Sequence, residues 1–427
     1  MKARTIRDNV YLLGHVDWDR RLFDALIPLP HGTSYNAYFV HGSQKSALID
    51  TVDPAKWATL AGQLDELPAP DYLVLHHVEQ DHSGSTPMLL ERYPELTIVC
   101  NAKAKAMLID HLHIDDARFA VVADGETLSL GDKTLTFVFT PWVHWPETMC
   151  TWLAEDRILF SCDFFGSHLA TSDLFADRHE VYDGAKRYYA EIMMPFGPQV
   201  LKNIDKVMQY PIAFIGPSHG PVYNDPQFIV DAYRDWAGGE PQNIVCLPFV
   251  SMHDSTRLMV DHLTMALADR GVTVERFDLT TLDAGQLATS LVHAGTIVLG
   301  TPTVLTGPHP LAANAAFLAN ALRPRAKYAT VIGSYGWAGK TVETLKELLG
   351  RLKVEFLEPV MVKGLPRAAD YEALDRLADT IADKHRDLAQ RRFADSLVCR
   401  PLSVGRHRPR VRRRDAADKD RLTPCAP

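Results

Sequence analysis

Short apolar runs recur through the first half of the chain, separated by polar turns and a few amphipathic stretches. Examples are YLVL at 72–75, LTIVC at 96–100, LTFVFT at 135–140 and RILFS at 157–161. Apolar runs this short, bounded by turn residues, predict strands rather than helices. We therefore expect a sheet-rich α/β domain over residues 1–240.

The second half of the chain has a different rhythm. The strand-like segments IVCLPF, VTVERF, TIVLG, YATVIG and VEFL alternate with helical stretches. This alternation predicts a doubly wound parallel sheet over residues 241–393. The segment WAGGEPQN (236–243) predicts a linker or domain edge, and apolar spacing predicts a last helix from about Ala368 to Arg391.

Composition places the chain among globular proteins and away from membrane proteins. It has 427 residues, of which 46% are hydrophobic and 23% are charged, as expected for two or three folded domains. No window reaches the ~18 consecutive apolar residues of a membrane span, and charges interrupt the N-terminus where a signal peptide is apolar. We expect a cytoplasmic protein without a membrane partner.

Charge and cysteine usage exclude further classes of site. The net charge is −8, yet residues 400–414 hold seven arginines and no acidic residue. We interpret residues 394–427 as a basic, disordered tail with no nucleic-acid partner, because no aromatic residues or folded scaffold accompany the arginines.

The six cysteines form no C-x-x-C pair, which excludes a zinc ribbon, a rubredoxin-type iron site and a ferredoxin-type cluster within this chain.

A dense group of possible metal ligands follows the strand predicted at 72–75. It consists of His77, Glu79, Asp81 and His82. Where a strand passes into a loop, alternate side chains such as His77, Glu79 and Asp81 can turn into one pocket. His82 would then enter from the turn beyond. The sequence therefore predicts a metal site at the end of this strand.

Three more possible ligands follow later strands, namely His144 in TPWVHWPETM, Asp163 in LFSCDFFGSH and His219 in IGPSHGPVY. Seven ligands exceed the needs of one tetrahedral ion and suit two metals. One division gives the first metal His77, Glu79 and His144, and the second metal Asp81, His82 and His219, with Asp163 bridging them. Imidazole and carboxylate ligands without a thiolate suit non-haem iron or manganese and are tolerated by zinc.

The second half carries a candidate flavin site at three predicted strand ends. The first strand end carries Ser251, Met252, His253, Asp254, Ser255 and Thr256, directly before a helical run. Hydroxyls and backbone N–H groups at a helix N-terminus bind a monoester phosphate. The other two strand ends carry Thr301, Pro302 and Thr303, and then Ser334, Tyr335, Gly336 and Trp337. Ligands bind at this edge of parallel sheets, where Tyr335 or Trp337 can wall a planar ring.

These motifs resemble a known family. The first of the three loops resembles the FMN phosphate loop of flavodoxins, from which it departs by carrying His253 and Asp254. The H-x-E-x-D-H pattern, together with PWVHWPETM and PSHG, resembles the flavodiiron proteins, also called A-type flavoproteins, and the likeness extends over residues 5–390. It implies a metallo-β-lactamase-like αββα sandwich holding two iron ions through all seven ligands, followed by a flavodoxin-like domain binding FMN. His168 also fits the family pattern, but we keep it outside the ligand set.

The resemblance implies an oxidoreductase that reduces O₂ to water, NO to N₂O, or both, at a di-iron centre re-reduced through FMN. Because the two cofactors lie in different domains, it also implies a head-to-tail homodimer or a dimer of dimers. Electrons are expected from a separate donor, either a rubredoxin, a ferredoxin or their reductase. The preference between O₂ and NO stays open.

Two other classes of function remain open alternatives. The first is a zinc-dependent hydrolase of the metallo-β-lactamase type, in which a metal-bound hydroxide attacks an ester or amide. Glu79 and the flavin loops argue against it. The second is a non-catalytic flavin electron carrier or sensor, against which the complete set of ligands argues. Metal analysis separates the first alternative from a di-iron protein, and gas turnover separates the second.

Overall fold

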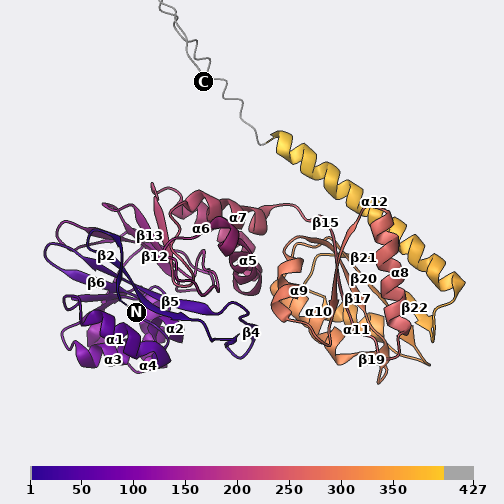
Figure 1. The fold of residues 1–427 in the computed structure, drawn as a ribbon, viewed down its shortest axis with the longest axis horizontal. Helices are drawn as coiled ribbons and strands as arrows, with labels where there is room; N and C mark the ends of the chain where they lie inside the picture. Colours follow the sequence, from indigo (N-terminus) through magenta and orange to yellow (C-terminus); the bar gives the residue numbers. More distant parts are fainter. Residues whose placement is uncertain (1, 399–427) are drawn as a thin grey trace, which may run out of the picture.

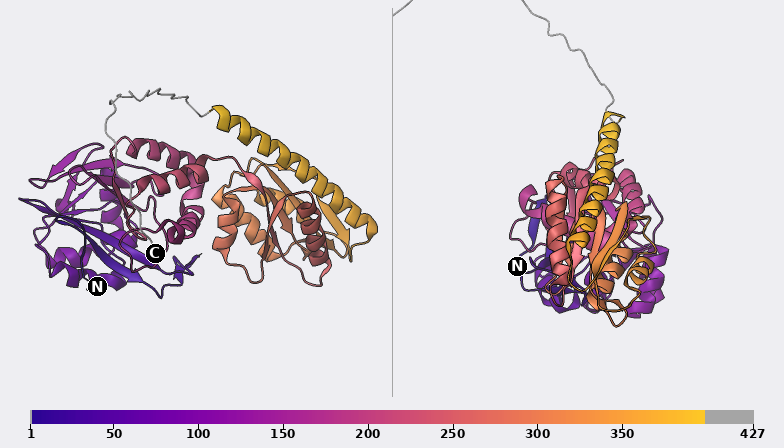
Figure 2. Two further views of the ribbon diagram at one scale, coloured as in Figure 1. Left: turned by 45° about the horizontal axis from the view of Figure 1, so that its top comes forward. Right: turned by 90° about the vertical axis from the view of Figure 1, so that its right-hand side faces the viewer.

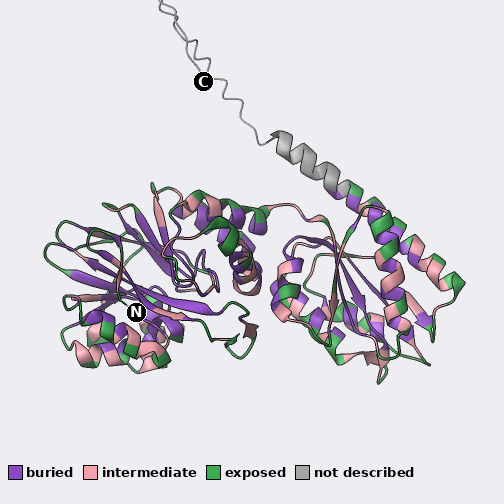
Figure 3. Ribbon diagram, in the orientation of Figure 1, coloured by how far each residue is buried: buried purple, intermediate pink, exposed green. Residues whose placement is uncertain are grey.

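The computed structural model describes residues 2–398, which form two bodies joined at residues 239–241 (Figure 1). The first body contains two large sheets, and the second contains one. Buried residues concentrate on the strands and on the inward faces of the helices in both bodies (Figure 3). Each body therefore has the layered core of a folded α/β unit.

The first sheet has seven strands in the order β1-β2-β5-β6-β7-β8-β9. They are β1 (Arg4–Arg7), β2 (Val10–Asp17), β5 (Thr33–His41), β6 (Ser46–Ile49), β7 (Tyr72–Val74), β8 (Thr97–Cys100) and β9 (Phe119–Val121). Its outer face is covered by α1 (Trp57–Leu64), α3 (Thr86–Arg92) and α4 (Ala102–Leu112). Between β2 and β5, the chain forms a two-stranded hairpin of β3 (Leu22–Phe23) and β4 (Ile27–Pro28).

The second sheet has five strands in the order β10-β11-β12-β13-β14. They are β10 (Thr127–Ser129), β11 (Thr134–Phe139), β12 (Met149–Leu153), β13 (Ile158–Cys162) and β14 (Phe214–Pro217). Its outer face is covered by α5 (Arg178–Tyr188), α6 (Gly197–Val207) and α7 (Pro226–Gly238). Val74 of β7 and Phe160 of β13 belong to the buried core between the two sheets. The first body is therefore the predicted αββα sandwich.

The third sheet has the order β16-β15-β17-β20-β21, with β22 also paired to β20, and all of these pairs are parallel. Its strands are β15 (Gln242–Phe249), β16 (Thr273–Asp278), β17 (Ala294–Gly300), β20 (Tyr328–Tyr335), β21 (Glu355–Phe356) and β22 (Val360–Lys363). This order, with the first strand second from the edge, is that of the flavodoxin-like doubly wound sheet and confirms the predicted fold class.

Helices cover both faces of the third sheet. One face packs against α8 (Ser255–Asp269) and α12 (Ala368–Val398), and the other packs against α9 (Ala284–Leu291), α10 (Pro310–Leu322) and α11 (Thr341–Leu348). Figure 2 shows α12 running along the body beside α8. Within residues 2–398, neither α12 nor any other helix is long and apolar enough to cross a bilayer.

The segment predicted as a linker or domain edge contains the end of α7, at Gly238, and the start of β15, at Gln242, so residues 239–241 connect the two bodies. Buried Trp236 packs against Tyr189 and Tyr233, which holds the last turn of α7 in the core despite the nearby glycines. The last helix continues to Val398, beyond the predicted end at Arg391, because residues 391–398 contain neither glycine nor proline. Residues 394–398, predicted as the start of the disordered tail, are therefore helical, and residues 399–427 of the predicted tail lie outside the described residues.

Candidate metal centre and flavin site

The seven predicted metal ligands lie at strand ends that meet at one edge of the sandwich. His77 and Glu79 lie in the loop after β7, and Asp81 and His82 lie on the short helix α2 (Gln80–Ser83). His144 lies between β11 and β12, Asp163 directly follows β13, and His219 follows β14. Asp81 and His82 are therefore helical, whereas we expected Asp81 to continue the loop. Both side chains belong, with His219, to a second group of ligand-type residues.

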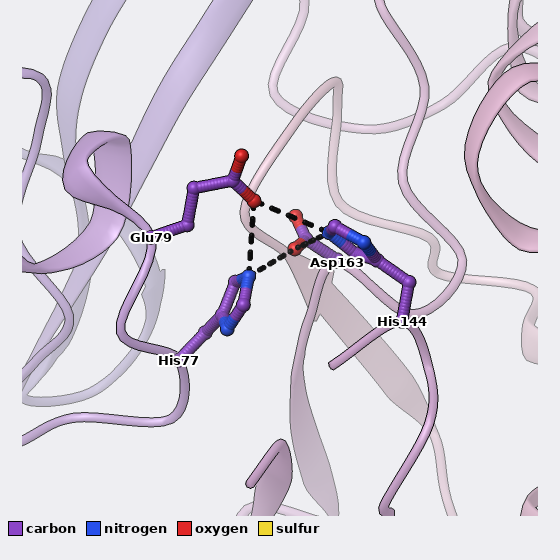
Figure 4. A group of neighbouring side chains, drawn as sticks. All are labelled: His77, Glu79, His144 and Asp163. Carbon is purple, nitrogen blue, oxygen red and sulfur yellow. Dashed lines mark hydrogen bonds and ion pairs between the residues drawn. The ribbon is translucent and has the colours of Figure 1, made fainter. Parts of the chain in front are cut away.

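The first group consists of His77, Glu79, His144 and Asp163 (Figure 4). Glu79 Oε2 lies 3.1 Å from His77 Nε2 and 3.3 Å from His144 Nε2. Asp163 Oδ2 lies 3.6 Å from His77 Nε2 and 3.4 Å from His144 Nε2. Four ligand atoms from four segments of the chain thus point at one small volume.

The second group consists of Asp81, His82 and His219. Asp81 lies 3.3 Å from His82 Nε2 through Oδ1 and 3.1 Å from His219 Nε2 through Oδ2. The other oxygen of Asp163, Oδ1, lies 3.2 Å from His82 Nε2 and 3.3 Å from His219 Nε2. Asp163 therefore turns one oxygen toward each group, which is the arrangement of a carboxylate that bridges two metals.

The spacing of these atoms fits a pair of metal ions. Bonds of about 2.1 Å to a common ion place neighbouring ligand atoms about 3 to 3.5 Å apart. Both carboxylate oxygens of Asp81 and Oδ2 of Asp163 are buried, and the described partners that face them are histidine nitrogens, at 3.1 to 3.6 Å. Buried carboxylate charge requires a cation close by, so two metal ions would stabilise these oxygens. The seven residues could therefore hold two metals.

Buried partners orient several of these side chains. His77 Nδ1 donates to Glu147 Oε1 at 2.7 Å, and His219 Nδ1 donates to the carbonyl of Ser34 at 2.6 Å. Each ring consequently presents the lone pair of Nε2 to the pocket. The Tyr188 hydroxyl donates to Asp163 Oδ1 at 2.8 Å. Glu147 is not among the residues predicted from the sequence, although its place in PWVHWPETM, three residues after His144, is a usable signal.

His76 and Cys162 also lie near the pocket, but neither is suited to bind a metal. His76 uses Nδ1 toward Asp50 at 2.8 Å and Nε2 toward Thr151 at 2.7 Å, which leaves no nitrogen for a metal. Cys162 Sγ lies 3.8 Å from His82 Nδ1, and burial raises the pKa of this thiol well above its usual range. It therefore stays protonated and is a poor metal ligand.

Carboxylates raise the pKa values of the histidines in both groups. Burial disfavours the charged ring, but Asp163 and Glu79 outweigh it and raise the pKa of His144 to about 9. Asp163 and Asp81 likewise outweigh burial and raise the pKa of His219 to about 9. Burial alone would raise the pKa of Asp163, yet His82 and the other histidines hold it well below its usual range. Protons therefore take the place of metal ions when the site is metal-free.

These pKa shifts predict how the metal-free protein responds to alkali. A histidine whose pKa is raised on folding stabilises the folded state fully below its unfolded pKa of about 6.5, and loses that contribution as pH rises through about 9. We expect the free energy of unfolding of metal-free protein to fall by about 5 kcal/mol between pH 7 and pH 9.5, from His144 and His219 together. Urea denaturation across this range measures the fall. Iron-loaded protein should not show it, and equal slopes for the two forms would contradict the prediction.

A cavity of about 170 Å³ opens beside both groups. Its lining includes Phe23, Asp24, Ile27, His168, Tyr188, Glu191, Ile192 and all of the predicted ligands except His77. His168 Nδ1 lies 2.9 Å from Thr33 Oγ1, and burial lowers the pKa of His168 well below its usual range, so this ring is neutral. The cavity is large enough for a diatomic molecule together with several waters.

The first predicted flavin loop brings hydroxyls to the N-terminus of α8. Ser255 Oγ lies 2.8 Å from Ser334 Oγ, and Thr256 Oγ1 lies 3.3 Å from the same atom. Ser251 Oγ accepts from the backbone N–H of Arg257 at 3.2 Å. The side chain of Asp254 is 80% exposed and lies 3.7 Å from the Arg257 guanidinium. It therefore points outward, as a phosphate in this loop would require, and Met252 and His253 are exposed too.

The other predicted flavin residues lie at the same sheet edge, on β20 and around the hairpin of β18 (Thr303–Val304) and β19 (Gly307–Pro308). Ser334 and Tyr335 belong to β20, which is longer than predicted, and Gly336 and Trp337 are exposed beyond it. Gly333 is required there, because a Cβ atom at this position would lie 1.8 Å from the carbonyl of Thr301. Thr301 Oγ1 donates to the carbonyl of Pro302, and Thr303 Oγ1 lies 2.7 Å from Thr341 Oγ1 at the start of α11.

Comparisons with known proteins agree with this architecture. Residues 33–220 match the model of the ODP family beta lactamase. The nitric oxide reductase of Moorella thermoacetica is 34% identical, over 88% of this chain and 98% of its own length. The solved rubredoxin oxygen:oxidoreductase of Desulfovibrio gigas has a TM-score of 0.88 at 34% identity, covering 91% of this chain and 100% of that chain. A flavo di-iron protein mutant from Thermotoga maritima has a TM-score of 0.83 at 26% identity, covering 90% and 98% respectively.

Proposed function

Because this chain belongs to the flavodiiron protein family, we propose that it is an oxidoreductase that reduces O₂ to water, NO to N₂O, or both. Two iron ions would be held in the first body by the seven histidine and carboxylate side chains, and FMN at the carboxyl edge of the third sheet. The observation that carries this proposal is that Asp163 turns one oxygen toward each ligand group. A shared carboxylate keeps two metals close enough to act on one small molecule.

The residues around the metal pocket suit a small gas molecule. Phe23, Ile27 and Ile192 form an apolar part of its wall, beside which an uncharged diatomic molecule can lie, and the cavity of about 170 Å³ has room for it. Iron and FMN supply the electron transfer that amino-acid side chains cannot. The chain itself would hold the two metals, and it orients the ligand rings through Glu147 and Ser34.

Electrons would come from a separate protein. The chain contains no C-x-x-C pair and hence no rubredoxin-type iron site of its own. One relative is named for rubredoxin as its reductant. We propose a rubredoxin, a ferredoxin or their reductase as the donor to FMN.

Anaerobic stopped-flow spectroscopy tests the proposed function. The protein, loaded with iron and FMN, is reduced and then mixed with O₂ or NO in excess, in the presence of a reductant. We expect the flavin to reoxidise over many turnovers, with N₂O formed from NO or water formed from O₂ without release of peroxide. Failure to consume either gas, or a native protein that contains zinc and no iron, would overturn the proposal.

We further propose a head-to-tail dimer, because exposed apolar side chains surround both sites. Near the flavin loops, Leu305 is 92% exposed and Trp337 is 80% exposed. Near the metal pocket, Leu22 and Leu26 of the β3–β4 hairpin are exposed as well. Apolar groups gathered around functional sites mark interaction surfaces. A dimer that joins the flavin edge of one chain to the hairpin of its partner would bury both sets and bring flavin and iron together.

Leu305→Glu should weaken this dimer. A charged side chain in the apolar contact costs several kcal/mol, so we expect sedimentation to show monomer and gas turnover to fall more than about 10-fold. FMN and iron contents should remain unchanged. Met265→Glu, on an exposed turn of α8, adds the same charge away from the flavin loops and serves as the control. A Leu305→Glu monomer with full turnover would contradict the head-to-tail arrangement.

A further inference from the structure

A buried carboxylate in the wall of the metal pocket has no part in the ligand set. Glu191 lies on the single π-helical turn η3 (Tyr189–Met193) that follows α5, and its side chain is 6% exposed. It lines the same cavity as Glu79, Asp81 and His144. Its Oε2 atom is buried and has no hydrogen-bond partner within residues 2–398. One oxygen of this carboxyl group is therefore left free in the wall of the pocket.

The other oxygen of Glu191 is held by Arg187 of the first body, which is itself bound by the second body. Oε1 accepts from Arg187 Nε at 3.2 Å, and Arg187 also donates to both oxygens of Asp283, at 2.6 and 2.7 Å. Asp283 directly precedes α9. Gly285, in the first turn of α9, has no room for a side chain, because a Cβ atom there would lie 2.1 Å from Glu191 Oε1. The position of Glu191 is therefore fixed by contacts from both bodies.

The charges that face Glu191 leave it able to exchange a proton at neutral pH. Arg187 on α5 favours the carboxylate, whereas Asp283 before α9 opposes it, and Asp24 of the β3–β4 turn lines the pocket with it. Burial is the dominant influence and raises the pKa of Glu191 to about 7. A carboxylic acid with a pKa close to the working pH is an efficient general acid.

Both candidate reactions consume protons where the gas is bound. Reduction of O₂ to two waters takes four electrons and four protons, and conversion of two NO to N₂O and one water takes two of each. We propose that Glu191 is the acid that supplies these protons to the bound gas, an inference that rests on the proposed function. The O–H bond of Glu191 breaks, a new O–H bond forms on the oxygen of the reduced gas, and Arg187 stabilises the carboxylate left behind. A water molecule in the pocket then returns the proton from solvent.

Two substitutions separate proton donation from a structural role. Glu191→Gln keeps an oxygen that accepts from Arg187 but cannot act as an acid, and Glu191→Ala removes both properties. We expect gas consumption to fall about 100-fold in both variants at pH 7. Reduction of the flavin by the donor should be unchanged, and a small weak acid such as acetic acid should restore part of the rate of the alanine variant. Exposed Glu180, on the first turn of α5, gives the matched control Glu180→Gln.

A second readout does not depend on turnover. Difference infrared spectroscopy on the loaded wild-type protein should show a protonated carboxyl band that disappears with a midpoint near pH 7 and is absent from Glu191→Gln. Wild-type turnover should decline as pH rises through the same midpoint, and the glutamine variant should lack this decline. Full activity of Glu191→Gln, with loss only in Glu191→Ala, would show a structural role and overturn the inference. Wild-type protein that consumes neither gas would instead overturn the proposed function.

Discussion

Replacing Asp163 by asparagine should abolish gas reduction. Among the described ligand residues, Asp163 places one carboxylate oxygen beside each ligand group. Its two oxygens lie 3.2 to 3.6 Å from four histidine nitrogens. An amide has a single oxygen to offer and no negative charge, so it can serve one metal at most. Loss of a supporting partner of a metal ligand typically costs 10–100-fold, and loss of a shared ligand should cost more than about 1000-fold in turnover.

Iron quantitation and gas consumption on the same Asp163→Asn sample check this expectation. We expect fewer than two iron ions per chain, with the FMN content unchanged, because the flavin loops lie in the other body. Asp173→Asn provides the control, since Asp173 is exposed and ten residues away on the same stretch of chain. If Asp163→Asn keeps two irons and wild-type turnover, Asp163 does not bridge two metals.

Ser255→Glu should prevent FMN binding. The hydroxyls of Ser255, Thr256 and Ser334 cluster at the N-terminus of α8, where unpaired N–H groups and the helix dipole favour an anion. A glutamate in this cluster would replace the phosphate as the bound anion and repel it. A pair of like charges within about 4 Å at a protein surface costs about 4 kcal/mol, which corresponds to a loss of affinity of at least about 100-fold.

Flavin fluorescence quenching during titration of flavin-free protein measures this loss. Ala321→Glu, at an exposed position of α10, adds one negative charge to the same body away from the hydroxyl cluster and should bind FMN normally. Iron content of Ser255→Glu should match the wild type. Normal FMN affinity in Ser255→Glu would contradict the assignment of this loop to the flavin phosphate.

The identity of the candidate ligands could be predicted from the sequence because their chemistry is local. Four ligand-type residues lie within the six-residue run from His77 to His82, and His144, Asp163 and His219 each follow an apolar strand. The carboxyl ends of strands in packed sheets tend to meet, so this order along the chain already indicated one site. The sequence allows several ways of dividing the seven ligands between two metals, and Asp163 bridges the metals in only one of them.

The residues that orient and line the pocket could not be found in this way. Glu147 and Ser34 act through hydrogen bonds to His77 and His219, across 70 and 185 residues of sequence respectively. Glu191 is an ordinary glutamate in its own segment, and its burial arises from the approach of α9 in the second body. Such partners follow from the packing of distant elements, which no local pattern encodes.

The sequence by itself determined the two sheet classes, the identity of the candidate ligands and the hydroxyl loop, because strand periodicity, ligand type and capping residues depend on neighbouring positions. Only the tertiary structure decided which oxygen of Asp163 faces which histidines, which way Asp254 points, where α7 and α12 end, and that Glu191 lies in the pocket wall. These features depend on distances between segments far apart along the chain, and those distances are fixed only when the sheets and helices pack together.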